Sequence, residues 1–340
     1  MVQLRRMISE TDPLSFFPVP YPDESFYSIL CRYMVHSGLP STRETLMVLF
    51  GKEFSPGSTL LLPYMSSIIS KKINPETGIT EDGIIRGHTA FHYFRIAHTA
   101  KESEAMFERI RNGRNFGYRF NYKKSMAATR LCYCPVCAFE EKNRYGEMYW
   151  HREHQIGGIV YCKDHAVKLK ESLVRLGDIK RSFIPASFAL RDIYGLSLDE
   201  ACGDNEYCRG NFKEKYKAIQ RDIKWLMETG DKLPGLEETI RIYEHMFEKS
   251  DMIDYSSSGM IEDLPGLRRM VKEYFGGEFL SSLHLELHEY FEWDSAPSII
   301  MKYLTPLQHV LLMGFLCGSA EEFYRQGIKR YKDYLPCNAI

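Results

Sequence analysis

Two short motifs in the middle of the chain carry side chains that bind metal ions: Cys134-Pro-Val-Cys137 and Cys162-Lys-Asp-His165, separated by twenty-four residues. We call them the first and second knuckle. In each, a gap of two residues lets the backbone turn around one ion. Three thiolates and one imidazole suit Zn²⁺, and four protein ligands leave no position for a catalytic water. The spacing predicts one structural zinc site, formed by Cys134, Cys137, Cys162 and His165.

Neighbouring residues leave the ligand set open. Cys132, His151 and His154 lie in the same stretch, residues 131–169, which holds four of the nine cysteines of the chain. We expect His151 and His154 to pack over the zinc or to hydrogen bond to its ligands, and each of the three residues is a candidate substitute ligand. The competing interpretation of the cysteines is that they are small buried apolar residues without a metal.

The order of residues around the knuckles resembles that of a known family. C-P-x-C is followed by Tyr-Gly-Glu, Tyr-Trp-His-Arg, His-Gln and C-x-x-H, and F-x-P-x-P-Y-x-D-E-S stands at residues 16–25. This pattern is similar to the TniQ/TnsD family of transposon target-selection proteins, most sharply in the zinc region. The resemblance implies a protein that recognises an insertion site and recruits a TnsC-like AAA+ ATPase, the regulator that engages the transposase.

The resemblance leaves two modes of targeting open. TnsD-like proteins bind an attachment sequence in duplex DNA, whereas some TniQ proteins sit on a CRISPR effector complex whose guide RNA reads the sequence. Basic helices after residue 210 favour direct DNA binding. The longest relatives continue beyond the equivalent of Asn338, which leaves open whether this chain carries every DNA-reading part.

Composition limits the class of protein. The 340 residues are 44% apolar and carry a net charge of -1, so any attraction to nucleic acid must come from local patches. Nine cysteines, an odd number, and an amino terminus without an apolar core argue for a reducing compartment. The longest apolar run, residues 310–318, is too short to span a membrane. We expect a soluble cytoplasmic protein that does not bind membranes.

Two short helices are predicted before the zinc region. Apolar residues recur at helical spacing over residues 26–33, after a cap at Asp23 or Ser25. A second helix is predicted from Ser41 to Gly51. Their outline is that of a helix-turn-helix or of an ordinary helical hairpin.

Residues 113–130 form a basic segment without acids, in which aromatic residues alternate with polar ones. A period of two predicts a strand with one aromatic face. The opposite face could contact phosphates or simply face solvent. The candidate nucleic-acid contacts here are Arg114, Arg119, Lys123 and Lys124.

The chain after residue 186 is predicted to be helical. A basic helix over residues 267–274 follows another helix and a polar break, which again suggests a helix-turn-helix. Its exposed cations, Arg268, Arg269 and Lys272, are the better candidates for DNA contact.

Catalytic signatures are missing from the sequence. It contains no convergent set of carboxylates, no G-x-x-x-x-G-K-[ST] phosphate loop and no G-x-S-x-G motif. The enzymatic alternative is a zinc-dependent hydrolase in which His151, His154 and either Glu153 or Glu147 surround an open metal. We expect an adaptor without catalytic residues.

The sequence thus predicts a mainly α protein in which helix-turn-helix-like domains flank a small zinc-ribbon or zinc-finger module with short β-strands. The predicted units are an amino-terminal helical domain (1–112), a basic strand with the zinc module (113–185), and a carboxyl-terminal helical TnsD-like domain (186–340).

Overall fold

The structure, a computed structural model, describes residues 13–114, 129–202, 210–250, 261–283 and 304–331, with Ser256 and Lys302 as single residues. The described chain is mainly helical and contains one small antiparallel sheet of two strands. The predicted aromatic strand of the basic segment, including Arg119, Lys123 and Lys124, lies outside the described residues.

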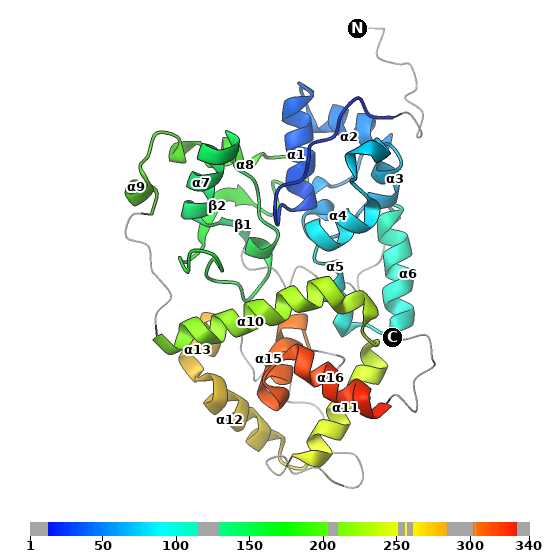
Figure 1. Ribbon diagram of the computed structural model, residues 1–340, viewed down its shortest axis with the longest axis vertical. Coiled ribbons are helices and arrows are strands. Elements are labelled where there is room, and N and C mark those ends of the chain that lie inside the picture. Colours follow the sequence, from blue (N-terminus) through cyan, green and yellow to red (C-terminus); the bar gives the residue numbers. More distant parts are fainter. Residues whose placement is uncertain are drawn as a thin grey trace.

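The amino-terminal part is a group of short helices (Figure 1). Its elements are α1 (Phe26–His36), α2 (Thr42–Phe50), η1 (Pro56–Thr59), α3 (Ser66–Ser70), η2 (Pro75–Thr77), α4 (Glu81–His88), α5 (Phe91–Phe94), η3 (Arg95–Ala97) and α6 (Ala100–Arg111). The central part contains β1 (Arg130–Tyr133), α7 (Pro135–Tyr145), η5 (Glu153–Gln155), β2 (Lys170–Arg175), α8 (Ala186–Ala189), η6 (Arg191–Ile193) and α9 (Leu198–Cys202).

Longer helices make up the carboxyl-terminal part. They are α10 (Gly210–Thr229), η7 (Gly230–Lys232), α11 (Leu236–Lys249), α12 (Leu264–Phe275), α13 (Gly277–Ser282), α15 (Pro306–Cys317) and α16 (Ala320–Tyr331). The long helix α10 contacts α4 and α5 on one side and α15 and α16 on the other, so it links the two ends of the fold (Figure 1). Within the described ranges, every helix is too short or too polar to cross a membrane.

Local sequence signals account for most helix ends. The Ser25 hydroxyl accepts a hydrogen bond from the Ser28 amide and begins α1, which confirms one of the two predicted caps. Thr305 and Gln308 form a capping box at the start of α15. The helix α2 ends at Gly51 in the left-handed conformation, as predicted.

The predicted carboxyl-terminal helix-turn-helix stays a prediction. Fourteen residues, 250–263, lie between α11 and α12, whereas the turn of that motif has about three or four residues. Most of these fourteen residues lie outside the described part of the chain.

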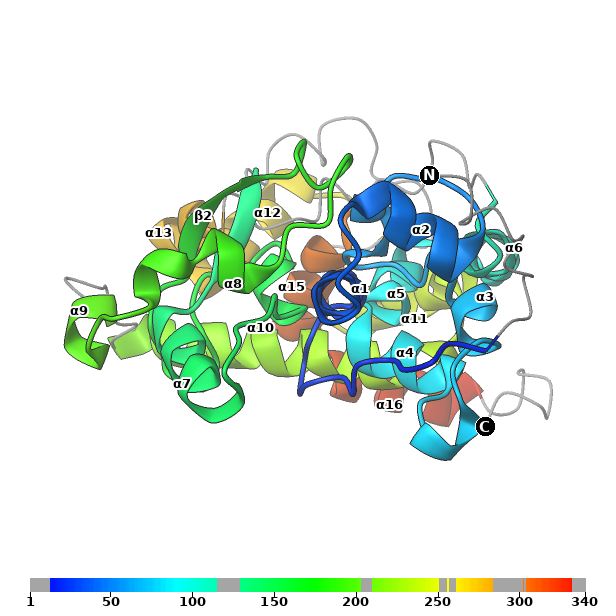
Figure 2. The ribbon, with the colours of Figure 1, turned by 90° about the horizontal axis from the view of Figure 1, so that it is seen from above.

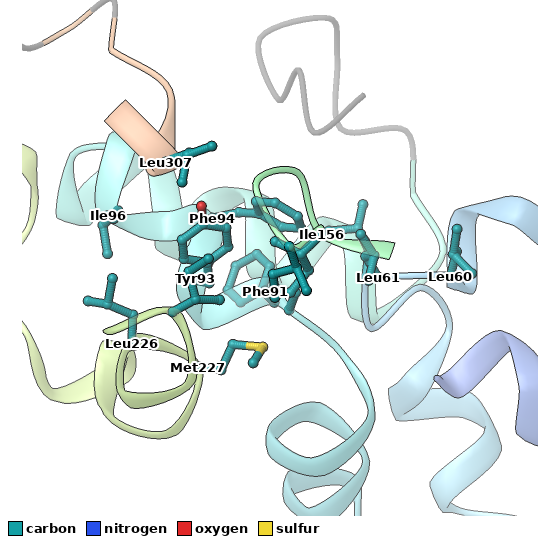
Figure 3. Packing of buried hydrophobic residues seen from close by; sticks show 14 of the residues in the cluster. Leu60, Leu61, Phe91, Tyr93, Phe94, Ile96, Ile156, Leu226, Met227 and Leu307 are labelled. Atoms are coloured by element: carbon teal, nitrogen blue, oxygen red, sulfur yellow. The ribbon is translucent and has the colours of Figure 1, made fainter. Parts of the chain in front are cut away.

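One hydrophobic cluster runs through all three parts of the chain. Figure 3 shows part of this cluster, where Phe91 and Phe94 of α5 lie beside Ile156, a residue between the two knuckles. Leu226 of α10 and Leu307 of α15 lie around them. Burial of these side chains removes apolar surface from water at each junction. The three units predicted from the sequence therefore share one core.

A glycine allows a close approach between the segment that joins the two knuckles and α15. Gly158 has a φ of +89°, and a Cβ atom there would lie 2.6 Å from a methyl carbon of Leu307. Another residue would be strained in backbone conformation and would clash with Leu307. Residue 158 is thus fixed by packing between distant segments.

An ion pair links the amino-terminal helices to the end of α10. The Arg86 guanidinium of α4 donates to both carboxylate oxygens of Asp231 in η7, at 2.9 and 2.6 Å. Burial alone would raise the pKa of Asp231, but the hydrogen bonds from Arg86 outweigh it and lower the pKa. The pair therefore stabilises the contact only while Asp231 is ionised.

We predict that Asp231→Asn lowers the free energy of unfolding by about 1 kcal/mol near pH 7. Because the folded-state pKa lies below the unfolded value of about 3.9, this contribution is present above about pH 4 and is lost as the pH falls further. Urea denaturation of both proteins at several pH values measures it. The exposed partner Asp82 provides the control, Asp82→Asn. An equal gap between wild type and Asp231→Asn at every pH would contradict the prediction.

Candidate metal centre

The first knuckle is positioned by the junction of β1 and α7. Cys134 is the N-cap of α7, Pro135 occupies the first helical turn, and the Cys137 amide donates to the Cys134 sulfur at 3.5 Å. Proline suits this turn because the first amides of a helix have no partner within it. The helix start therefore directs both sulfurs to one side.

The second knuckle is a tight turn. The Cys162 amide donates to the Val167 carbonyl at 2.8 Å, and the Ala166 amide donates to the Cys162 carbonyl at 2.8 Å. Ala166 has a φ of +54°, in the left-handed region that a non-glycine residue rarely adopts. This turn places Cys162 and His165 on the same side as the first knuckle.

Pairing of β1 with β2 brings the knuckles together. The first knuckle follows β1 directly and the second precedes β2, and Tyr133 pairs with Lys170 in the antiparallel register. The ends of the two motifs are therefore held side by side. Figure 1 shows α7, β1 and β2 grouped next to the helix α1.

The four predicted ligands meet at one point, with their ligand atoms all within 4.8 Å of one another. The Cys137 and Cys162 sulfurs are 3.6 Å apart. His165 Nδ1 lies 3.6 Å from the Cys134 sulfur, 3.3 Å from that of Cys137 and 3.5 Å from that of Cys162. The Cys137 and Cys162 sulfurs are too far apart for a disulfide bond, which is about 2.05 Å long.

These separations fit an ion at the centre of the four atoms. A tetrahedral ion bound about 2.3 Å from sulfur and about 2.1 Å from nitrogen separates two sulfurs by about 3.8 Å and a sulfur from the nitrogen by about 3.6 Å. The observed distances are close to both values. The cluster is therefore able to hold one metal ion in a closed shell.

Hydrogen bonds among the four side chains shift two of their pKa values. Hydrogen bonds from Cys134 and Cys137 hold the pKa of the Cys162 thiol well below its usual range. Hydrogen bonds to Cys134 and Cys162 raise the pKa of His165 to about 11, so an imidazolium balances a thiolate while the four residues share only protons. A cation that binds all four ligands would displace these protons.

Two neighbouring side chains orient the ligands. Glu140 Oε2 lies 3.2 Å from His165 Nε2, the ring nitrogen that points away from the cluster. Such a carboxylate fixes the tautomer that leaves Nδ1 available for a metal. His154 is buried and hydrogen bonds to Cys162, which agrees with the role predicted for it.

The other candidate ligands lie outside the group of four. The Cys132 sulfur faces the Arg130 carbonyl, and its backbone pairs with the Gln155 side chain. His151 groups with Cys137 and Glu141, and its Nε2 lies 2.5 Å from a Glu141 oxygen. His151 is therefore hydrogen bonded to a carboxylate, and of the four predicted ligands it groups with Cys137 alone.

The residues of the hydrolase alternative are occupied elsewhere. Glu147 pairs with Arg32 and His36, and Glu153 pairs with Lys163. Within the described ranges, neither carboxylate belongs to a group able to hold a metal ion. The arrangement does not assemble the open site that this alternative requires.

Few apolar contacts surround the centre. Cys134, Val136, Cys137, Cys162 and Val167 form a small cluster that is separate from the main core. So small a group buries little surface, and a bound ion would supply much of its stability.

The part of the chain that contains this centre is similar to a known family. The TniQ family model matches residues 15–169, which include the helices α1 to α6 and both knuckles. We call residues 15–169 the TniQ domain, after the family model that they match. Over 153 residues the chain is 28% identical to the transposon Tn7 transposition protein TnsD of Escherichia coli. This match covers 44% of the chain and 30% of that relative. The resemblance to the TniQ/TnsD family is confirmed for this part of the sequence.

A buried ion pair joins the two halves of the TniQ domain. Asp23, which precedes α1, accepts hydrogen bonds from Arg152 Nε at 3.0 Å and from the Glu153 amide at 3.1 Å. Arg152 Nη1 also donates to the carbonyls of Arg86 and Thr89. Burial alone would raise the pKa of Asp23, but the Arg152 charge and a hydrogen bond with His151 hold it well below the usual range.

A second buried cation strengthens the same junction. Arg32 of α1 contacts Glu24 at 2.9 Å and Glu147 at 2.8 Å, and its guanidinium lies 3.7 Å from the centre of the Tyr21 ring. Figure 2 shows α1 between the sheet and α7 on one side and α2, α3 and α6 on the other. Within the TniQ domain, the part that carries the two knuckles therefore packs directly on α1.

These ion pairs were not predictable from the sequence. Asp23 and Arg152 are 129 residues apart, and Arg32 and Glu147 are 115 apart. Separations of this size carry no periodic signal. The motifs D-E-S and W-H-R contain Asp23 and Arg152, but nothing in them indicates that the two pair.

The predicted DNA contacts are spread over the surface. Arg114 is exposed beyond the end of α6 in the TniQ domain. Arg269 and Lys272 are exposed on α12, with Arg269 4.0 Å from Asp263, while Arg268 is partly buried. The structure brings the four cysteine and histidine ligands together, but it leaves Arg114 and the α12 cations on separate elements.

Proposed function

We propose that this chain is a target-site selector of a transposon, which recognises target DNA and recruits the AAA+ ATPase regulator of the element. The observation that carries the proposal is the TniQ domain, assembled around a four-ligand centre and similar in sequence to a Tn7 transposition protein. In this proposal the protein acts as an adaptor without catalytic chemistry. It meets the transposase only through the ATPase.

We further propose that the centre binds one Zn²⁺ through Cys134, Cys137, Cys162 and His165. A zinc ion would supply rigidity, because a closed shell of protein ligands leaves no site for a substrate. The ion pairs of Arg152 with Asp23 and of Arg32 with Glu147 would then hold α1 in a fixed position relative to the centre. The amino-terminal helices would then present one fixed surface to the ATPase.

Charge on the carboxyl-terminal helices supports α12 as the surface that contacts DNA. On α10, Lys217 lies 3.1 Å from Glu214 and Lys224 lies 3.7 Å from Glu228, so these cations are largely neutralised. On α12, Lys272 and Arg269 are exposed, and Arg269 is separated from Asp263 by 4.0 Å, the outer limit of an ion pair. Phosphates attract cations that are not already closely paired.

We predict that Arg269→Ala combined with Lys272→Ala weakens DNA binding. It should also make the salt dependence shallower, reducing the magnitude of the negative slope of log affinity against log salt by about two. Mobility shifts on fragmented host DNA and on the element's flanking sequence, at two salt concentrations without the ATPase, measure both. The control is Lys217→Ala with Lys224→Ala, which removes two cations that already have acidic partners. An equal loss in both double variants would contradict the assignment to α12.

The same assay distinguishes the two targeting modes. Retention of one fragment at physiological salt would mean that the chain reads DNA itself. Weak, salt-dependent binding to every fragment would mean that it takes its specificity from another component. An RNA-guided CRISPR effector complex is then the partner to test by pull-down.

A further inference from the structure

A cavity of about 360 Å³ opens beside the metal centre. It lies between α7, residues 22–23 ahead of α1, and the second knuckle, and the ligands Cys137 and His165 form part of its wall. Ligand pockets are typically about 300–1,000 Å³, so this one suits a single side chain better than a large cofactor. Neither the proposed metal binding nor the proposed DNA contact uses this space.

The wall of the cavity is acidic at its exposed edge. Glu140 is 62% exposed, and its Oε2 lies 3.2 Å from His165 Nε2, while Asp164 is exposed on the second knuckle. The deeper carboxylates already have cationic partners: Glu141 has His151, and Asp23 has Arg152. Three thiolates around Zn²⁺ would add one further negative charge. The electrostatic environment therefore favours a cation.

Aromatic rings complete the wall. Tyr145 and Tyr149 line the cavity, and both pack on Tyr21, with ring centres 4.2 and 5.1 Å away. Tyrosine faces attract cations, and guanidinium groups in particular. Tyr21 already receives Arg32 at 3.7 Å, with the carboxylates of Glu24 and Glu147 beside it. The cavity repeats this combination of carboxylates and tyrosine rings without an arginine of the described chain in its centre.

The lysine and the arginine of the wall each have another contact. Lys163 lies 2.8 Å from Glu153, so its charge is neutralised locally. Arg144 is exposed near the end of α7, and its guanidinium lies 5.2 Å from the centre of the Tyr145 ring. Arg144 would therefore oppose a cationic occupant and attract an anionic one.

We propose that this cavity receives an arginine side chain of a protein partner, whose guanidinium pairs with Glu140 and Asp164 and packs against Tyr145. Arginine fits better than lysine because its planar fork binds carboxylates in pairs and stacks on rings. An arginine within a peptide also fits better than the free amino acid, whose own carboxylate the acidic edge would repel. This inference does not depend on the proposed role in transposition, but part of its electrostatic argument rests on the proposed zinc ion.

The test uses a blocked peptide, acetyl-Gly-Gly-Arg-Gly-Gly-amide, and its citrulline counterpart, which has nearly the same shape but no charge. Saturation-transfer NMR with the full metal-loaded chain reports weak binding of each. We expect contact at the arginine methylenes and binding of the citrulline peptide weakened at least about fivefold, because the charge pairs are lost. Equal binding of the two peptides, or binding of neither, would overturn the proposal.

Variants assign the binding to this cavity. Asp164→Asn and Glu140→Gln should each weaken the arginine peptide by roughly twofold to fivefold, and Arg144→Gln should strengthen it by a similar factor. Glu76→Gln, an exposed acid on η2, is the control. Variants are compared at equal metal content, and Arg144→Gln keeps the test valid if a change in the knuckle prevents folding. Two results would indicate an anion site and refute the proposal. One is weaker binding of the arginine peptide by Arg144→Gln. The other is tight binding of a single-stranded oligonucleotide by the wild type that is lost in Arg144→Gln.

Discussion

Replacing Cys162 with serine is expected to remove the metal and to unfold the region between β1 and β2. Structural zinc sites contribute an apparent free energy of about 10–16 kcal/mol in small peptides, which is comparable with the whole stability of a domain, about 5–15 kcal/mol. The small apolar cluster around the cysteines is separate from the main core, to which Trp150 and Ile156 of the same region belong. We expect the free energy of unfolding to fall by at least about 5 kcal/mol.

Metal analysis and thermal unfolding of the purified variant measure this effect. Cys132→Ser is the matched control, because Cys132 is also buried but lies outside the group of four. It should retain one metal per chain and nearly the wild-type stability. Full metal content in Cys162→Ser would contradict the proposed ligand set, and loss of metal in Cys132→Ser would assign a ligand role to Cys132.

The second large effect is expected for Arg152→Met. Methionine keeps much of the apolar stem but removes the guanidinium, which leaves the Asp23 carboxylate buried without its nearest cation. The carbonyls of Arg86 and Thr89 also lose a donor. Breaking a buried pair in this way costs about 3–5 kcal/mol. The Asp23–Arg152 pair joins the start of α1 to the segment between the knuckles. We therefore expect the whole TniQ domain to be destabilised.

Urea denaturation of matched variants isolates the pair. Arg43→Met breaks an exposed pair with Glu53 and should cost less than about 1 kcal/mol. Asp23→Asn removes the buried charge, so adding Arg152→Met to that variant should cost less than adding it to the wild type. An equal loss in the two backgrounds would mean that packing of the arginine stem, and not its charge, is responsible.

The pH dependence has a definite sign. The pKa of Asp23 lies below its unfolded value of about 3.9. Its contribution to stability is therefore present above about pH 4 and is lost as the pH falls below that value. Asp23→Asn should lack this acidic decline, which urea denaturation at several pH values would measure.

Several local features were predictable because their causes are local. The Ser25 cap, the end of α2 at Gly51 and the start of α15 at Thr305 each depend on residues within one helical turn. The grouping of Cys134, Cys137, Cys162 and His165 was also predictable, because a two-residue gap between such side chains has a geometric meaning wherever it occurs. The packing of α11 and α12 was not predictable, since a polar stretch does not reveal how the flanking helices pack.

By itself, the sequence determined the helical character of the chain, its main capping residues and the four side chains that form the candidate metal centre. Only the tertiary structure decided that Asp23 pairs with Arg152, that Gly158 packs against Leu307, and that α10 joins both ends of one core. The physical reason is the range of each interaction. Caps and knuckles depend on residues a few positions apart. The other contacts depend on how segments far apart in the sequence pack together and on which charged side chains are buried next to each other.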